Sequence, residues 1–302
     1  MTDKSLRDIY TAHEGLVSDK WDSYLIKYNR LFQPIRTERI QLLEIGVQNG
    51  GSLEIWSKFF PNAVAIVGCD VDQGCAKLRY SDARISVIVD DITSPSAKLS
   101  IESVSADFHI IIDDGSHTSS DIIGTFFGYF PLLKMHGHYI IEDLHCSYWT
   151  QFEGGLSNQF SSMNFLKDLS DLVNHEHWGV DISRTQFLEK FGVESNAKTE
   201  QLLSEIHSVE FVNSMCIVTR QPAMENLLGI RHVVGTQELV SQNKFANGTY
   251  SIPPSQETRD CESSADHLTD KDEYILSLKR RIAELESKPH KVHVNIDDSY
   301  QP

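Results

Sequence analysis

The stretch IQLLEIGVQNGGSLEIWSKFFPNAVAIVGCD (40–70) decides the fold of this chain. It opens with an apolar run over 40–46 that a glycine stops, and apolar residues at helical spacing follow over 52–60. A second apolar run over 63–70 ends in an acid. Near-continuous apolar runs are typical of strands buried on both faces, as in parallel sheets covered by helices. The stretch therefore predicts a strand, a glycine turn, a helix and a second parallel strand.

Three further apolar runs extend this alternation, and each ends in acidic residues. They are ISVIVDD (85–91), ADFHIIIDD (106–114) and GHYIIED (137–143). A helical pattern lies between the last two, with apolar residues at Ile122, Phe126, Phe130 and Leu133. Strands and helices that alternate at this spacing are typical of a doubly wound sheet. We therefore predict an α/β fold of the Rossmann-like type, with helices on both faces of the sheet.

The acids at the strand ends gather at one edge of such a sheet. They are Glu44, Asp70, Asp90, Asp91, Asp113, Asp114, Glu142 and Asp143. Ligands of open α/β sheets bind beyond the carboxyl ends of the strands. We call these strand-end acids the acidic rim and expect the active site there.

The rest of the chain divides by composition. Helices are expected around 4–14, 18–32 and 158–174, and two short strands over 209–220 with a turn at Asn213 and Ser214. The expected parts are an N-terminal helical segment (1–35), the α/β domain (36–235), a polar linker (236–270), a C-terminal helix (271–288) and a tail (289–302). The C-terminal helix carries apolar residues at 3-4-3 spacing, which suits either docking onto the same chain or self-association as a short coiled coil.

Composition limits the classes of partner and compartment. The 302 residues carry a net charge of −16, so the chain has no general electrostatic reason to bind nucleic acid or an anionic membrane. No apolar run approaches the roughly 20 residues of a membrane span, and the polar N-terminus lacks the apolar core of a secretory signal. The five cysteines are scattered and odd in number, which favours reduced thiols in a cytoplasmic protein.

The turn after the first strand, LLEIGVQNGG (42–51), is shaped for a nucleotide-like ligand. The dinucleotide pattern GxGxxG is absent because Gln48 stands at its second glycine, and there is no GK[ST] ending of a P-loop. The form E-x-G-x-x-x-G, with Glu44, Gly46 and Gly50, instead resembles the cofactor turn of S-adenosylmethionine (SAM)-dependent methyltransferases. The alternative is a tight turn in another Rossmann-like protein.

The chemistry of a SAM site suits the neighbouring acids. Glycines let the backbone approach the methionine part, and Glu44 can help hold a cationic cofactor. Asp70 is placed to accept from both ribose hydroxyls, and Asp91 could accept from the adenine amino group.

Two motifs at the fourth and fifth strand ends carry a more specific resemblance: IDDGSH (112–117) and IEDLHCSYWTQFEGG (141–155). With SDKWDSYLIKYNRLFQPIR (18–36) and the glycine turn, they make the chain resemble the macrocin and mycinamicin sugar O-methyltransferases. This is a metal-dependent group of the class I methyltransferase superfamily. The similarity runs roughly from residue 8 to 220 and implies the class I methyltransferase sheet.

The resemblance implies a magnesium site and a base. The implied metal ligands are Asp114, Glu142 and Asp143, and the implied general base is His117. Converging carboxylates repel one another unless a cation lies between them, and hard oxygen ligands suit Mg²⁺. Spacing alone leaves open whether Asp113 or Asp114 contacts the metal; the resemblance selects Asp114.

The resemblance implies a SAM- and Mg²⁺-dependent O-methyltransferase that methylates a hydroxyl of a sugar in a glycoside or polysaccharide. His145, Tyr148 and Trp149 follow the second motif and either face the acceptor or pack into the protein. Two alternatives stay open: the same chemistry on a non-sugar diol or catechol-like acceptor, and a non-catalytic Rossmann-like assembly subunit.

Overall fold

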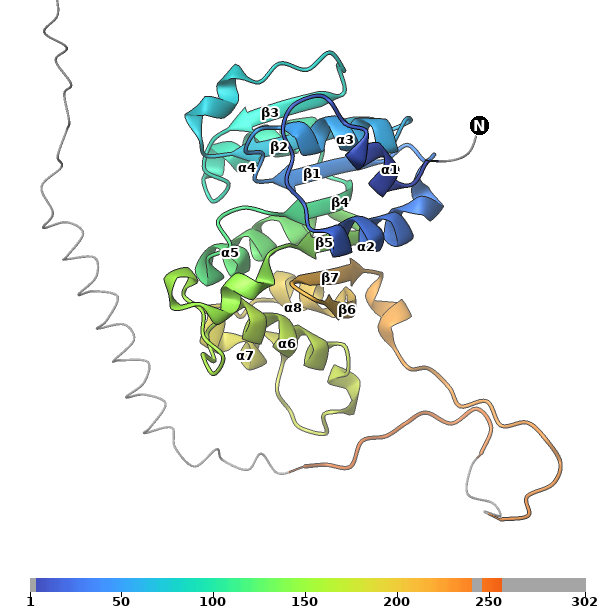
Figure 1. Cartoon of the computed structure of the whole chain (residues 1–302). Coiled ribbons are helices and arrows are strands. Elements are labelled where there is room, and N and C mark those ends of the chain that lie inside the picture. Colours follow the sequence, from blue (N-terminus) through green and yellow to red (C-terminus); the bar gives the residue numbers. More distant parts are fainter. Residues whose placement is uncertain (1–3, 241–245, 257–302) are drawn as a thin grey trace, which may run out of the picture. The chain divides into compact units, whose positions relative to one another are not determined.

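A seven-stranded sheet organises the part of the chain that the structure describes, residues 4–240 and 246–256 of a computed structural model (Figure 1). The order of the strands across the sheet is β3-β2-β1-β4-β5-β7-β6. The strands are β1 (Gln41–Ile45), β2 (Ala65–Asp70), β3 (Ile85–Val89), β4 (Phe108–Asp113), β5 (Leu133–Ile141), β6 (Ile206–Val212) and β7 (Met215–Arg220). The expected helix over 271–288 lies outside the described residues.

The first five strands are parallel, as the apolar runs predict, and they place their carboxyl ends at one edge. β7 runs antiparallel to both β5 and β6. The chain reverses between β6 and β7 at Ser214, whose φ of +66° is the left-handed conformation of a tight turn. The predicted hairpin over 209–220 is confirmed, and it closes the acidic rim beside β5.

Helices flank the sheet, and their number exceeds the sequence prediction. They are α1 (Leu6–Thr11), α2 (Asp22–Phe32), α3 (Gly51–Phe59), α4 (Pro95–Val104), α5 (Ser119–Tyr129), α6 (Ser162–Leu172), α7 (Arg184–Phe187) and α8 (Ala197–Ser204). The sequence prediction omitted α4, α7 and α8. A start signal for α4 was present, because Ser94 caps it by accepting from Ala97 N and Pro95 occupies its first turn.

The two N-terminal helices are shorter than predicted, and residues 12–21 between them form an extended connection that we call the strap. Its backbone bonds to α3 rather than to itself. Leu16 N donates to Glu54 Oε2 at 2.8 Å, and Gly51 N donates to Val17 O at 3.1 Å. These bonds satisfy groups that a continuous helix would have paired internally.

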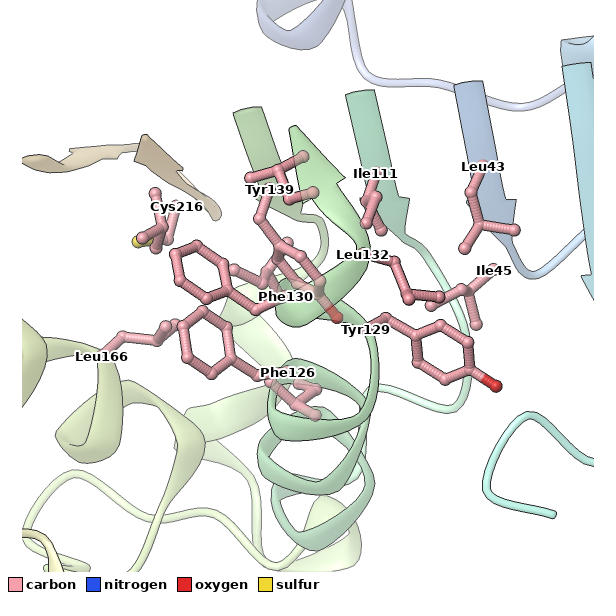
Figure 2. Packing of buried hydrophobic residues seen from close by; sticks show 14 of the residues in the cluster. Leu43, Ile45, Ile111, Phe126, Tyr129, Phe130, Leu132, Tyr139, Leu166 and Cys216 are labelled. Atoms are coloured by element: carbon pink, nitrogen blue, oxygen red, sulfur yellow. The ribbon is translucent and has the colours of Figure 1, made fainter. Parts of the chain in front are cut away.

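One hydrophobic core lies between the sheet and helices α4, α5, α6 and α8. Figure 2 shows Phe126 and Phe130 beside Tyr139 of β5, with Leu166 of α6 beyond them. The rings of Phe126 and Phe130 stack with centroids 4.8 Å apart. This face of the sheet is therefore sealed by aromatic packing below the acidic rim.

The opposite face packs against α1, α2 and α3. Neighbouring strand residues alternate between the two cores, because successive side chains of a strand point to opposite faces; Leu42 lies in this core and Leu43 in the other. Tyr28 and Phe32 of α2 stack at 5.3 Å within it. Docking of α2 here brings the end of the strap to the rim.

Candidate active site

A cavity of about 530 Å³ opens at the carboxyl ends of the parallel strands. The ends of all five parallel strands contribute side chains to it, and residues 17–20 of the strap line it as well. The rim acids that line it are Asp70, Asp90, Asp91, Asp113, Asp114 and Asp143. The fold therefore places most of the acidic rim around one cavity, where the sequence predicts a ligand.

The two glycines of the first turn have different functions. Gly46 lines the cavity with φ of +89°, and a Cβ there would lie 2.0 Å from Asp114 O. Gly50 begins α3 with φ of +81° and does not line the cavity; a Cβ there would lie 2.2 Å from the hydroxyl of Tyr80. Gly46 thus permits the close approach of the β1 and β4 ends, and Gly50 permits packing on Tyr80.

Asp70 and Asp91 both line the cavity. Asp70 Oδ2 accepts from the backbone N–H groups of Val47 and Gln48 at 2.7 and 2.8 Å. Burial alone would raise the pKa of Asp70, but these bonds and one from Asp72 N outweigh it and lower that pKa. The ionised carboxylate therefore fixes the glycine turn beside the cavity.

Glu44 lies beneath the cavity rather than on its wall. It is fully buried and accepts from Ser52 Oγ at 2.7 Å. Burial is the largest influence on Glu44 and raises its pKa, against the opposing charge of Lys20 at 3.4 Å. Glu44 thus reaches the cavity wall through Lys20 and Ser52, which both line it.

Asp114, His117 and Asp143 converge on one point of the cavity. One ligand atom from each lies within 4.8 Å of the others, and His117 Nε2 is 3.8 Å from Asp143 Oδ2. His117 and Asp143 have φ of +58° and +52°, which non-glycine residues rarely adopt. Two strained backbones therefore point an imidazole and a carboxylate at the same place.

Asp113 points away from this group. It is buried and accepts from Thr125 Oγ1 and from the hydroxyl of Tyr139. Burial raises the pKa of Asp113 to about 6. Asp114 is thus the aspartate of the pair that lies with His117 and Asp143.

Lys20 of the strap lies inside the acidic rim, and sequence reasoning assigned it no function. Its Nζ donates to Asp114 Oδ2 at 2.5 Å and to Glu142 Oε1 at 2.9 Å. Burial opposes its charge, but the surrounding carboxylates outweigh burial and raise the pKa of Lys20. Lys20 could have been identified as a site residue from its position within 18–36, one of the stretches that carry the family resemblance.

Glu142, an expected metal ligand, is buried and does not line the cavity. Its Oε1 accepts from Lys20 and also from the hydroxyl of Tyr28 at 2.5 Å. Burial raises the pKa of Glu142 to about 8, although Lys20 opposes this shift. The structure therefore places Glu142 one layer behind Asp114.

A row of aromatic rings, Trp21, His145, Trp149 and Phe152, borders Asp143; we call it the aromatic arc. Adjacent ring centroids along the row lie 6.1, 5.1 and 6.1 Å apart. Trp21 Nε1 donates to Asp143 Oδ1 at 3.0 Å, and the ring of Phe152 lies 6.4 Å from that of His117. Sequence reasoning named His145 and Trp149 but missed the other two.

Exposure distinguishes the members of this region. Trp21 is 58% exposed, Trp149 47% and Tyr148 41%. His145 Nδ1 pairs with Ser214 Oγ at 2.5 Å, which anchors the middle of the aromatic arc on the β6–β7 turn. Large aromatic surfaces left open beside a cavity favour a binding function over core packing.

The donor set at this edge suits a divalent cation. Asp114 and Asp143 offer hard carboxylate oxygens, and the imidazole of His117 lies beside them. Glu44 Oε1 is buried and accepts no hydrogen bond within the described residues. The carboxyl groups of Glu44, Asp114 and Glu142 surround the single ammonium of Lys20.

Similar proteins were found by sequence over about half of the chain. No protein-family model matches. A Streptomyces olivaceus 8-demethyl-8-alpha-L-rhamnosyl tetracenomycin-C 2'-O-methyltransferase is 33% identical over 53% of this chain and 44% of its own length. Demethylmacrocin O-methyltransferase of Streptomyces fradiae is 31% identical over 59% of this chain and 47% of its own. Mycinamicin VI 2''-O-methyltransferase of Micromonospora griseorubida is 33% identical over 52% and 41%.

This chain spans about half the length of the curated relatives it matches. None of the helices within 4–240 and 246–256 combines the length and apolarity needed to cross a membrane. Among solved structures, the MycE methyltransferase in complex with Mg and SAH matches with a TM-score of 0.60 and 24% identity, over 73% of this chain and 54% of that protein. The chain therefore has the Rossmann-like fold of class I methyltransferases and is similar in sequence, over about half its length, to O-methyltransferases that act on sugar-bearing compounds.

Proposed function

We propose that this chain is a SAM- and Mg²⁺-dependent O-methyltransferase that methylates a sugar hydroxyl in a glycoside or polysaccharide. One observation carries the proposal: a single cavity joins the glycine turn and its acids to the group of Asp114, His117 and Asp143. Methyl transfer needs a methyl donor and a hydroxyl side by side, and a cavity of this kind would bring the two together. The names of the homologous sugar O-methyltransferases support it.

The cofactor part of the cavity would be formed by the first three strand ends. The backbone at Gly46 would lie against the methionine part, Asp70 would accept from the ribose hydroxyls, and Asp91 from the adenine amino group. Asp91 Oδ1 already accepts from Thr93 N at 2.8 Å, which fixes the carboxylate toward the cavity. SAM, when bound, supplies an electrophilic methyl group.

The metal part would be formed by Asp114 and Asp143, with Glu142 as the expected third ligand behind them. Mg²⁺, when bound, supplies positive charge that stabilises the developing alkoxide. His117 would take the hydroxyl proton at Nε2, and the carboxylate of Asp143 at 3.8 Å would stabilise the resulting imidazolium. The strained backbone of His117 holds the ring toward the cavity.

The aromatic arc would bind the acceptor. Exposed aromatic faces suit the C–H surfaces of a sugar ring, and Trp21 and Trp149 present such faces beside Asp143. The structurally similar MycE methyltransferase was solved in complex with mycinamycin VI, and this supports a sugar-bearing acceptor for the present chain. Tyr148 adds a further exposed ring next to Trp149.

The remaining expectations about partners and compartment belong to the same proposal. A net charge of −16 argues against nucleic acid as a partner. Four cysteines within the described residues are free and buried, which suits the reducing cytoplasm: Cys69, Cys75, Cys146 and Cys216. Self-association through 271–288 remains a prediction for residues that the structure does not describe.

The test is to incubate the full chain with SAM, Mg²⁺ and a panel of glycosides and catechols, and to measure S-adenosylhomocysteine with and without EDTA. We expect turnover on a glycoside that stops on chelation and returns with added Mg²⁺. Turnover only on catechols would replace the sugar acceptor with the alternative one. SAM binding without turnover on any acceptor would favour the alternative of a non-catalytic Rossmann-like assembly subunit. Full activity after rigorous chelation would show that the reaction does not need a metal ion.

A further inference from the structure

The ammonium of Lys20 links three strand ends on the inner side of the acidic rim. It lies 2.5 Å from Asp114 Oδ2, 2.9 Å from Glu142 Oε1 and 3.4 Å from Glu44 Oε1. The Lys20 side chain is 4% exposed, so water and salt screen these charges little. Lys20 therefore performs inside the rim the charge balancing that a bound cation would perform at its mouth.

This arrangement divides the rim into two halves. The inner half consists of Glu44 and Glu142, which are buried behind Lys20 and do not line the cavity. The outer half consists of Asp114, His117 and Asp143, which line the cavity and converge within 4.8 Å. Asp114 belongs to both halves, because one of its oxygens pairs with Lys20.

The oxygen of Glu142 nearest to Lys20 has little capacity left for another cation. Glu142 Oε1 accepts both from Lys20 Nζ at 2.9 Å and from the hydroxyl of Tyr28 at 2.5 Å. A divalent ion in the outer half would lie near an ammonium that cannot move into solvent, because the side chain is buried. Two cations a few Å apart repel one another strongly where screening is weak.

We propose that Lys20 is a built-in counter-ion of the acidic rim that lowers the affinity of the site for Mg²⁺. Lys20 is a positioning residue: it acts on the ion through Asp114 and Glu142. The inference rests on the proposed function only in taking Mg²⁺ as the ion. It predicts that removing the ammonium strengthens metal binding, the opposite of what loss of a merely structural lysine would cause.

The test compares the full chain with its K20M and K27M variants after removal of metal. Lys27 is the matched control, because it lies in α2, pairs with Glu210 at 2.6 Å and does not line the cavity. Mg²⁺ binding is measured by titration calorimetry and thermal unfolding with and without Mg²⁺. We expect K20M to bind Mg²⁺ at least about tenfold more tightly, because a nearby like charge is gone. K27M should match the wild type.

Thermal unfolding gives a second readout. Without metal, K20M should unfold at a lower temperature, because its carboxylates lose their counter-ion. Added Mg²⁺ should raise its Tm more than that of the wild type. A K20M protein with unchanged or weaker Mg²⁺ affinity would overturn the inference.

The double variant K20M/E142Q keeps the test decisive if K20M folds poorly without metal. It removes Lys20 together with one of the carboxyl groups that it pairs with, so it should fold without Mg²⁺ and bind the ion about as tightly as the wild type. Tight binding retained in the double variant would contradict the pairing of Lys20 with Glu142. Failure of the wild type to bind Mg²⁺ would instead contradict the proposed function, and the two failures are therefore distinguishable.

Discussion

At the scale of single residues, the candidate site depends on backbone conformations that side chains rarely accept. Gln48, His117 and Asp143 all have φ between +51° and +58°, and all three line the cavity. Such conformations cost about 1–3 kcal/mol each and persist where surrounding contacts enforce them. Asp70 holds Gln48 by accepting a hydrogen bond from its backbone N–H. The Tyr24 hydroxyl holds Asp143 by accepting from its backbone N–H and donating to its carboxylate.

His117→Ala tests the proposed base. Because His117 Nε2 would accept the hydroxyl proton, we expect kcat to fall about 100-fold or more while SAM affinity stays near that of the wild type. Steady-state kinetics and calorimetric SAM titration measure the two effects. Lost SAM affinity with intact kcat would assign the histidine to the cofactor instead.

Asp114→Asn and Asp113→Asn test the assignment within the aspartate pair. Asp114 lies with His117 and Asp143, so the first variant should raise the Mg²⁺ concentration for half-maximal activity at least about tenfold. Asp113 accepts from Thr125 and Tyr139 inside the protein, so the second variant should change stability more than the Mg²⁺ requirement. Activity titrated with Mg²⁺, together with Tm, separates these outcomes.

How far the site could be predicted depends on whether a residue's function is local. The strand pattern places the following residues at the cavity, because each lies at the end of a strand or within four residues after it: Asp70, Asp91, Asp114, His117 and Asp143. Lys20 and Trp21 reach the site only because α2 docks on the sheet, across more than 100 residues from Glu142 and Asp143. No local pattern encodes such a contact.

At the scale of elements, the glycine turn between β1 and α3 can be tested by adding one methyl group. Gly46→Ala would bring a Cβ to 2.0 Å from Asp114 O at a φ of +89°, so backbone must move. We expect a loss of about 1–3 kcal/mol of stability and weaker SAM binding. The matched control is Gly124→Ala in α5, where a Cβ meets nothing within 4 Å. That variant should be about 0.5–1 kcal/mol more stable, because alanine favours a helix.

The pairing of β5 with β7 predicts a pH effect on stability. Burial of His138, which contacts Thr219 Oγ1, lowers its pKa to about 4, with Lys27 adding to the shift. Because the folded protein favours the neutral imidazole, His138 does not lower the stability of the fold above about pH 6.5, the pKa of an unfolded histidine. As the pH falls from about 6.5 toward 4, the unfolded state binds a proton that the folded state does not, and the fold loses stability. Between about pH 7 and about pH 5 the loss should be about 2 kcal/mol.

Urea unfolding of the wild type and His138→Gln at these two pH values checks this effect. Glutamine does not titrate, so the variant should lose less stability than the wild type on acidification. Equal losses in the two proteins would assign the pH dependence to other groups.

The sheet was more predictable from sequence than the helices. Buried parallel strands are continuous apolar runs, so five of them were found from sequence alone. α7 and α8 are short, with four and eight residues, and each presents few buried positions. The strap was predicted as helix ends because its hydrogen bonds go to α3, and local propensity does not report such partners.

At the scale of the whole molecule, both cores lie within residues 1–254. A chain ending at Pro254 should therefore fold independently, with a Tm within about 2 °C of the full chain. Thermal unfolding measures this, and a large drop would mean that 255–302 contribute to the fold. Sedimentation of both proteins tests self-association through 271–288, since only the full chain contains that segment.

The strap has a consequence for how sequences of this kind can vary. In few residues it bonds α3 through Val17, places Lys20 in the rim and sets Trp21 against Asp143. An inserted or deleted residue between Val17 and Trp21 would shift the partners of all three regions at once. The length of this connection is thus as strictly constrained as the side chains that perform the chemistry, although most of it forms neither helix nor strand.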